Sequence, residues 1–291
     1  MRKRKMNPVF KAALWMSGSI ASFSSMAVAG REISASLDTF EIMLYRSVVG
    51  VIIVILLAVL TGTWRDIRAD QIGTHVVRNL AHFTGQNLWF YAVTVIPLAQ
   101  VFALEFTSPI WVIVLSPLVL GERLTAVRGL AAVMGFIGIL IVAQPDMSGL
   151  NAGIVTAASS AIFFAVTMML TKRLTRTEGI TSILFWLTAM QLVMGLVMAG
   201  YDGDIAWPDA ITLPLVIMIG LAGLLAHFCL TNALSIAPAT VVVPIDFIRL
   251  PTIAVVGMLV YGEVVDLWVF IGAVIIFAGN YINILSETRN T

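Results

Sequence analysis

The chain has 291 residues, of which 59% are hydrophobic and only 11% are charged, and its formal net charge is +1. Soluble domains carry roughly 25% charged residues, so this composition excludes a water-soluble protein. A net charge so close to zero gives no support to a nucleic-acid partner. We therefore expect an integral membrane protein.

Apolar runs follow one another along the whole chain, and each is close to the roughly 20 residues with which a helix crosses a bilayer. Charged residues, glycines and prolines separate them. Pro97 and Pro238 stand in two of the shortest connectors, where we expect tight helical hairpins. The sequence predicts ten transmembrane helices, at residues 8–29, 39–61, 74–95, 98–120, 125–143, 151–171, 180–199, 210–236, 239–261 and 265–285.

The lysine and arginine residues predict the orientation, because connectors rich in them remain in the cytoplasm. Ten spans place both termini on the same side of the membrane. If the basic start of the chain, residues 2–5, is cytoplasmic, the external connectors contain only Arg31. We expect a multi-pass protein of a bacterial cell inner membrane with both termini in the cytoplasm.

The second half of the sequence repeats the first at a shift of 141 residues. The shift superposes Ala92 on Ala233, Pro97 on Pro238, Phe106 on Phe247, Gly121 and Glu122 on Gly262 and Glu263, and Gly138 on Gly279. Two five-helix repeats are predicted, at residues 1–145 and 150–288. Because five is an odd number, the two repeats cross the membrane in opposite senses, and such inverted repeats build a midplane site that can face either side.

Several short motifs resemble the EamA family of the drug/metabolite transporter (DMT) superfamily. They are Tyr91–Pro97, Ser108–Pro109 and Leu120–Leu124, repeated in part as Asn232–Pro238 and Tyr261–Glu263. The resemblance implies an all-α membrane protein with a 5+5 inverted repeat around a central cavity. It also implies a secondary active transporter that moves an amino acid, a vitamin, a nucleotide-like compound or another small metabolite by alternating access. Export is one direction that family members use.

Three charged residues inside the predicted spans are the first candidates for the site. Asp246 and Arg249 are three residues apart in the ninth span, so on a continuous helix they share one face and can neutralise each other. The repeat shift superposes Glu105 on Asp246. Charged side chains at this depth are costly to bury and usually have a function. The structural alternative is an ion pair in which the two groups only neutralise each other. A buried carboxyl group could also carry a proton in a transport cycle.

Other polar residues inside the spans could contact a substrate or form hydrogen bonds between helices. Arg46 in the second span could bind an anionic group, and Trp186 in the seventh could line a pocket. Arg78, close to the inner boundary, is predicted to extend to the lipid headgroups. The remaining candidates are His82, Gln86 and Asn87 in the third span, and His227 and Asn232 in the eighth.

The Gly121-Glu122 and Gly262-Glu263 pairs are interpreted as structural, with each glycine ending a helix. We find no catalytic, metal-binding or phosphate-binding motif, so the sequence predicts neither an enzyme nor a cofactor. The expected partners are a small-molecule substrate, membrane lipids and a proton or counter-substrate, and we expect a monomer or homodimer. The alternatives to a transporter are a membrane-embedded enzyme that acts on a lipid and a channel-like scaffold.

Overall fold

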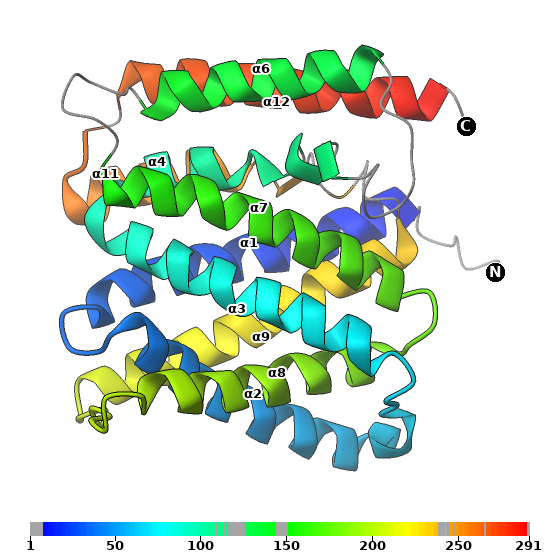
Figure 1. The fold of residues 1–291 in the computed structure, drawn as a ribbon, viewed down its shortest axis with the longest axis vertical. Coiled ribbons are helices and arrows are strands. Elements are labelled where there is room, and N and C mark those ends of the chain that lie inside the picture. The colour runs from blue at the N-terminus through cyan, green and yellow to red at the C-terminus, as the bar shows by residue number, and fades with distance from the viewer. Residues whose placement is uncertain are drawn as a thin grey trace, which may run out of the picture. The chain divides into compact units, whose positions relative to one another are not determined.

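The computed structural model describes residues 8–108, 110–112, 114–115, 126–143, 151–237, 242, 245–246, 248–264 and 266–289. Within these residues the chain is helical and contains no β-strand (Figure 1). The helices are α1 (Pro8–Ile33), α2 (Thr39–Leu60), the 3-10 helix η1 (Thr63–Asp66), α3 (Ile72–Val95), α4 (Leu98–Glu105), α6 (Ala126–Ala143), α7 (Ala152–Leu174), α8 (Ile180–Ala199), α9 (Thr212–Ile236), α11 (Arg249–Tyr261) and α12 (Leu267–Arg289).

Each of these α-helices falls on one of the ten predicted spans, and α8 has the predicted bounds of 180 and 199. The prediction of an all-α fold is therefore confirmed. Helix α4 covers only the first part of the fourth predicted span and α11 only the last part of the ninth, and several residues of both spans lie outside the described part of the chain.

Five of the described helices, α1, α2, α7, α8 and α9, are long and apolar enough to cross a membrane. Helix α3 is equally long, with 24 residues, but its sequence is less apolar. Several of its polar residues are buried, including His75, Asn79, His82 and Gln86. Polar residues within a membrane-spanning helix usually face the interior of the protein, as these do.

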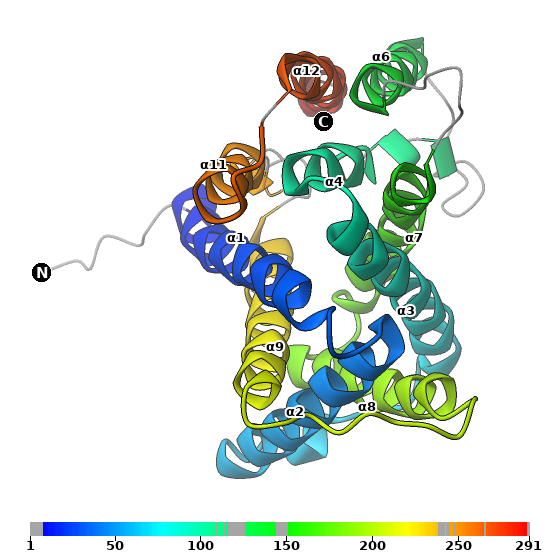
Figure 2. The same ribbon diagram turned by 90° about the vertical axis from the view of Figure 1, so that its left-hand side faces the viewer.

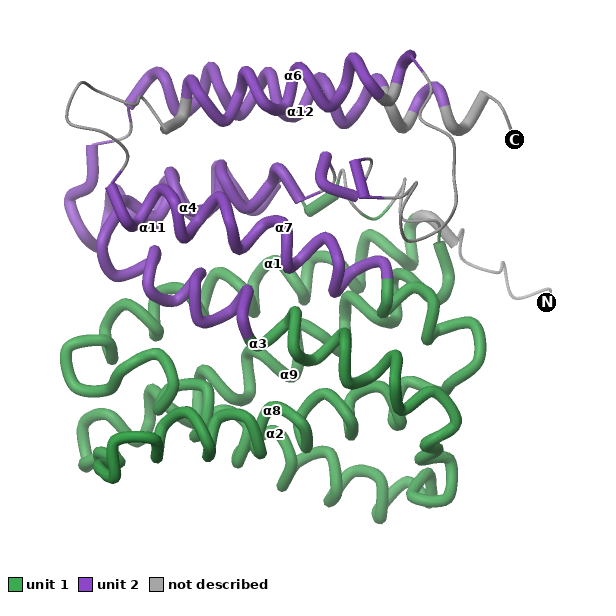
Figure 3. Tube along the Cα trace, viewed as in Figure 1, with its two compact units in different colours: residues 1–83, 170–246 green, residues 84–169, 247–291 purple. Residues whose placement is uncertain are grey.

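The structure divides into two compact units (Figure 3). Unit 1 comprises residues 1–83 and 170–246, and unit 2 comprises residues 84–169 and 247–291. Each unit therefore takes segments from both halves of the sequence. The repeat boundaries predicted at 1–145 and 150–288 describe sequence equivalence rather than compactness, and they remain a prediction.

In unit 1, α1 packs against α9, and α2 packs against both α8 and α9 (Figure 2). Glycines allow this close approach. A Cβ atom on Gly195 of α8 would lie 2.9 Å from the Leu44 Cα of α2, and one on Gly18 of α1 would lie 2.9 Å from the Cys229 Sγ of α9. Small residues at such crossings are typical of helices that pack inside a membrane.

In unit 2, α4 packs against α11, and Glu263 links the ends of these two helices. Gly262 ends α11 with a φ of 63°, in the left-handed region, which confirms its predicted role as a helix terminator. The next residue, Glu263, accepts a hydrogen bond of 3.0 Å from the backbone N–H of Leu98, the first residue of α4. A carboxylate is stabilising at a helix N-terminus. The Gly121-Glu122 pair lies outside the described residues.

The fourth and ninth spans are interrupted at equivalent positions. Helix α4 ends at Glu105 and is followed by turn residues Phe106 and Thr107, whereas α11 begins at Arg249 after the turn residue Ile248. The repeat shift superposes Thr107 on Ile248. Pro109 has no N–H to donate to the carbonyl of Glu105, and the Ser108 hydroxyl donates to that carbonyl instead, at 2.6 Å. Both halves therefore carry a broken helix.

Helices α6 and α12 run side by side in unit 2, and they cross where glycines replace side chains (Figure 1). A Cβ atom on Gly138 would lie 2.5 Å from Ile276 Cγ1 and 2.8 Å from the carbonyl oxygen of Gly272. Gly279, the repeat equivalent of Gly138, has equally little space, since its Cβ would lie 3.0 Å from the Ala131 carbonyl oxygen. This crossing cannot accept an added methyl group without moving backbone.

Gly138→Ala should lower the stability of the protein by roughly 1–3 kcal/mol, because overpacking forces the two helices apart. Gly129 lies on the same helix and provides the control, since no atom lies within 4 Å of a Cβ built there. Gly129→Ala should raise the stability by up to about 1 kcal/mol through helix propensity alone. Thermal unfolding of the two purified variants measures both effects. Equal midpoints would contradict the close crossing.

Candidate functional site

In unit 2, Glu105, Arg249 and Trp89 form a connected polar cluster. One carboxylate oxygen of Glu105 pairs with Arg249 Nη2 at 2.8 Å, and the other accepts a hydrogen bond of 2.8 Å from Trp89 Nε1. The Glu105 side chain is 12% exposed and that of Arg249 is 4% exposed. The cluster brings together the second half of α3, the end of α4 and the start of α11. It is a largely buried ion pair.

Two aromatic rings hold the guanidinium group of Arg249. Its Cζ atom lies 5.0 Å from the centroid of the Phe102 ring and 5.1 Å from that of Phe106. At these distances the face of an aromatic ring attracts a cation, and the attraction is larger when the cation is desolvated. Glu105 and the two rings therefore stabilise the charge of Arg249 within unit 2.

Both charges of this pair stand at the helix end that disfavours them. Glu105 is the last residue of α4, where the helix dipole is negative, and Arg249 is the first residue of α11, where the dipole is positive. A helix gains nothing from charges placed in this way. The charges of Glu105 and Arg249 stabilise each other, whereas the helix dipoles do not stabilise either charge. Local helix stability therefore does not explain why charged residues occupy these two positions.

The sequence predicted Arg249 to share a helix face with Asp246. Residue 247 lies outside the described residues, so the predicted pair of Asp246 and Arg249 remains a prediction. Within unit 2, Arg249 forms an ion pair with Glu105, which is 144 residues away in the chain.

The interior of unit 1 contains a second group of predicted residues, this time mainly basic. The imidazole rings of His82 and His227 meet edge to face, with their centroids 4.8 Å apart, and His227 makes a similar contact of 5.5 Å with Phe23. Arg46 is 9% exposed and lines a small pocket together with His227. Arg46 is also close enough to act on His227 electrostatically.

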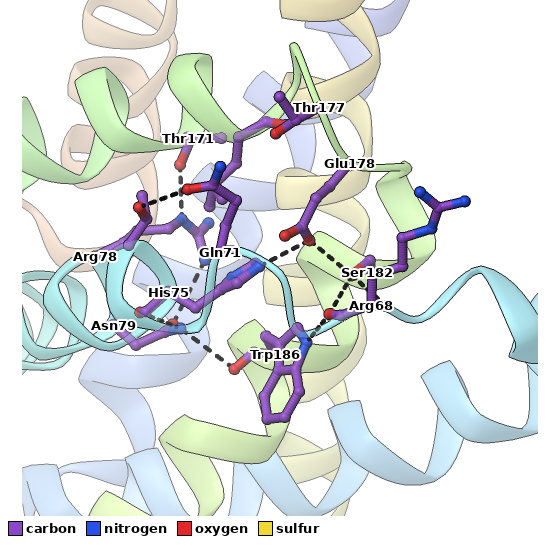
Figure 4. A network of polar contacts seen from close by, with 12 residues as sticks. Arg68, Gln71, His75, Arg78, Asn79, Thr171, Thr177, Glu178, Ser182 and Trp186 are labelled. Atoms are coloured by element: carbon purple, nitrogen blue, oxygen red, sulfur yellow. Dashed lines mark hydrogen bonds and ion pairs between the residues drawn. The ribbon is translucent and has the colours of Figure 1, made fainter.

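A polar network joins the first turns of α3 to the end of α7 and the start of α8, also in unit 1 (Figure 4). His75 Nε2 lies 2.8 Å from Glu178 Oε2, which also accepts a hydrogen bond of 2.7 Å from the Ser182 hydroxyl. Trp186 donates its indole N–H to the carbonyl of Arg68 at 2.6 Å. Trp186 therefore belongs to this network, and its contacts within unit 1 do not identify a substrate pocket.

Arg78 does not extend to the lipid headgroups, so the prediction for this residue is wrong. Its side chain is 1% exposed, and its Nε donates a hydrogen bond of 2.7 Å to the hydroxyl of Thr171 (Figure 4). A second, longer contact of 3.5 Å joins it to the side chain of Asn79. The hydrogen-bonding partners on α7 and α3 keep this arginine inside unit 1.

The remaining predicted residues lie on the expected helices. Gln86 is buried on α3 and Asn87 is half-buried beside it, both in unit 2. The amide of Asn232 donates to the carbonyl of Phe228 within its own helix, at 2.8 Å. That contact satisfies the amide locally. The prediction that residues of both units surround one common cavity remains a prediction.

Sequence reasoning missed His75, Glu178 and Gln191. His75 and Glu178 lie near predicted helix ends, where charged residues are usually taken as exposed. Gln191 is a single polar residue in an apolar span, 3% exposed, and this isolation was the available signal. Among the described residues, no group of three or more His, Cys, Asp or Glu side chains is arranged to hold a metal ion.

The chain was compared with known proteins. It is 26% identical over 290 residues to an S-adenosylmethionine uptake transporter of Rickettsia felis, covering 98% of this chain and 97% of that protein. It is 32% identical over 243 residues to a riboflavin transporter of Brucella anthropi, covering 82% and 85% of the two chains. A solved crystal structure matches the fold with a TM-score of 0.66, at 18% identity, over 96% of this chain and 98% of the other.

The sequence model of the EamA-like transporter family matches the chain twice, at residues 10–144 and 151–285. The two matches cover nearly all of the chain and follow its two-repeat organisation. They also agree with the all-helical structure of the described residues. The protein therefore belongs to the EamA-like transporter family.

Proposed function

We propose that the protein is a secondary active transporter that carries a small organic metabolite across a bacterial inner membrane by alternating access. In this proposal both termini lie in the cytoplasm, and the two repeats have opposite orientations. Family membership supports transport as the activity. The ion pair between Glu105 and Arg249 is the observation that carries the mechanism, because it stands where both broken helices end.

Broken helices with charged residues at their ends are typical of transport sites. The pair of Glu105 and Arg249 is costly to bury, and local helix stability does not explain it. Its two members belong to helices from opposite halves of the sequence. An ion pair that joins the two repeats in this way can open when the repeats move, which gives it a role in the transport cycle.

In the proposed cycle, the closed pair holds α4 and α11 together in one state. Protonation of Glu105 removes the negative charge that pairs with Arg249 and so releases Arg249. Trp89 retains its hydrogen bond to the second carboxylate oxygen and keeps Glu105 in position. Coupling to a proton or to a counter-substrate follows, because whatever binds one member of the pair determines whether the other is free.

The named relatives supply the substrates for the first test, S-adenosylmethionine and riboflavin. Purified protein in liposomes should take up one of these labelled compounds, or a metabolite of similar size, with a rate that saturates. Preloading the liposomes with the unlabelled compound should accelerate uptake by exchange. The measurement is counterflow of unchanged label.

Two results would contradict this proposal. A flux that rises in proportion to concentration and shows no exchange would indicate a channel-like scaffold. Recovery of a chemically altered compound, with no accumulation of the original, would indicate an enzyme. Liposomes that contain the double variant of Glu105→Leu with Arg249→Met provide the control for leakage, since that variant keeps the membrane-spanning helices but lacks the ion pair.

A further inference from the structure

A small pocket in unit 1 lies between α2, α8 and α9. Its enclosed volume is about 10 Å³, roughly the space of one water molecule, and the rest of the hollow opens outward. Three of the polar residues that line it, Arg46, Gln191 and His227, are each at least nine-tenths buried. The lining residues are Arg46, Ser47, Gly50, Leu187, Thr188, Gln191, Gly220, Leu224 and His227.

Arg46 carries a positive charge into this pocket without a carboxylate partner among the described residues. Its one hydrogen bond there is a contact of 3.5 Å to the sulfur of Met43, a weak acceptor. The side chain is 9% exposed. A buried charge without a paired counter-ion is costly, so the fold retains an arginine that a ligand could satisfy.

His227 and Gln191 offer further unsatisfied groups to the same pocket. His227 Nε2 and Gln191 Oε1 are both buried, and neither has a hydrogen-bond partner in the described part of the chain. Gln191 is held in place through its amide nitrogen, which donates to the carbonyl of Asn79 at 3.0 Å. A ligand that reaches Arg46 would therefore also meet a histidine nitrogen and a fixed amide oxygen.

Positively charged side chains surround the pocket, and a glycine leaves space for the side chain of Arg46. Arg78 acts on His227 electrostatically, as Arg46 does, so two buried guanidinium groups contribute to the field there. Gly223 of α9 makes space for one of them, because a Cβ atom on it would lie 2.7 Å from Arg46 Nη2. Oxygen atoms with negative charge are the groups that such a field attracts.

We propose that this pocket binds an oxyanion, a carboxylate or a phosphate, that belongs to the transported substrate. The arginine supplies two parallel N–H groups for the two oxygens, and His227 can donate to one of them. This inference rests on the proposed function, which it makes more specific. It restricts the substrates to compounds with an anionic group and assigns that group to Arg46.

Thermal unfolding of the purified protein in a neutral detergent tests the proposal without a known substrate. Sodium acetate and sodium phosphate are compared with sodium chloride at equal ionic strength, at about 20 mM, where a ligand with a Kd of about 1 mM should raise the midpoint by roughly 4–7 °C. At least one oxyanion should raise it, and chloride should not. If neither oxyanion stabilises the wild-type protein more than chloride does, the proposal is wrong.

Two variants locate the effect. Arg46→Gln should lose the oxyanion response, whereas Arg65→Gln, at an exposed arginine, should keep it. Gln191→Glu places a carboxylate in the pocket and should also remove the response, because the internal anion competes with the added one. An oxyanion response that survives in Arg46→Gln, or in a folded Gln191→Glu protein, would overturn the assignment.

The phosphate of a phospholipid headgroup is another oxyanion that this pocket could bind, and a second unfolding experiment tests for it. Mixed micelles with phosphatidylglycerol are compared with micelles that contain phosphatidylcholine. Stabilisation by phosphatidylglycerol alone, with no effect of acetate or phosphate, would assign the pocket to lipid and reject the substrate site.

Failure of this inference and failure of the proposed function can be told apart. The unfolding experiment measures binding and needs no transport, while the liposome assay measures transport and needs no knowledge of the pocket. Saturable counterflow together with no oxyanion response would leave a transporter whose substrate is recognised elsewhere. An oxyanion response that depends on Arg46, without counterflow of any compound, would instead contradict the transport proposal.

Discussion

Arg249→Ala should leave little folded protein and abolish uptake, which is the largest effect that we expect from a single substitution. The change removes Arg249 from its ion pair with Glu105 and leaves the largely buried Glu105 carboxylate without this counter-ion. Breaking a buried ion pair by removing one member costs about 3–5 kcal/mol. The yield of folded protein in the membrane and its thermal midpoint both measure this cost. Arg176→Ala, at an exposed arginine, provides the control and should change neither.

The double substitution of Glu105→Leu with Arg249→Met separates folding from transport. Replacing both members of a buried pair by apolar residues of similar size is often neutral for stability, so the double variant should fold better than Arg249→Ala. Uptake per amount of folded protein should nevertheless be lost, because the variant has no ion pair to open and close. Near-normal uptake by the double variant would show that the pair only supports the structure.

The membrane-spanning helices could be predicted from the sequence because their lengths have one dominant cause. The bilayer sets each apolar run at roughly 20 residues, and charged residues or glycines mark the ends. The prediction for α8 matches both ends, and those for α2 and α6 match to within one residue at each end. The internal repeat predicted that the two halves are built alike. Its equivalent glycines Gly138 and Gly279 both lie where an added Cβ atom would come too close to the neighbouring helix.

The partners of the buried charges could not be predicted in the same way. Sequence spacing proposed Asp246 for Arg249 and did not propose the ion pair that Arg249 forms with Glu105. A contact between residues 144 apart depends on tertiary packing, which a hydrophobicity pattern does not report. For the interrupted helices, Pro109 and Pro251 were the available signals, since each lacks the N–H that a continuous helix needs.

Residues near the helix ends were the other source of error. Arg78 was predicted to reach the headgroups, but its side chain is 1% exposed. Distance from the end of a helix predicts exposure only if no neighbouring helix covers that end. The polar network around His75 and Glu178 occupies the same region, and it joins segments that are 103 residues apart in the chain.

Glu178→Ala should destabilise unit 1 by about 3 kcal/mol, which is equivalent to a fall of roughly 6–12 °C in the thermal midpoint. The Glu178 carboxylate pairs with His75 and accepts from the Ser182 hydroxyl through the same oxygen atom. The side chains of His75 and Glu178 are 0% and 2% exposed, so water cannot replace the lost contacts. Glu32→Ala, at an exposed glutamate, is the matched control and should change the stability by no more than about 0.5 kcal/mol.

Glu178→Gln tests whether this contact depends on the charge of the carboxylate or only on its hydrogen bonds. A glutamine of the same shape can still accept from Ser182 and can form a hydrogen bond with a neutral His75, so it should recover most of the stability if the histidine is uncharged. If His75 is protonated, removal of the negative charge leaves a buried cation, and Glu178→Gln should be nearly as unstable as Glu178→Ala. The midpoints of the two variants, compared with that of the double substitution of His75→Leu with Glu178→Leu, decide between these states. A Glu178→Ala protein as stable as the Glu32→Ala control would show that the network contributes nothing to the fold.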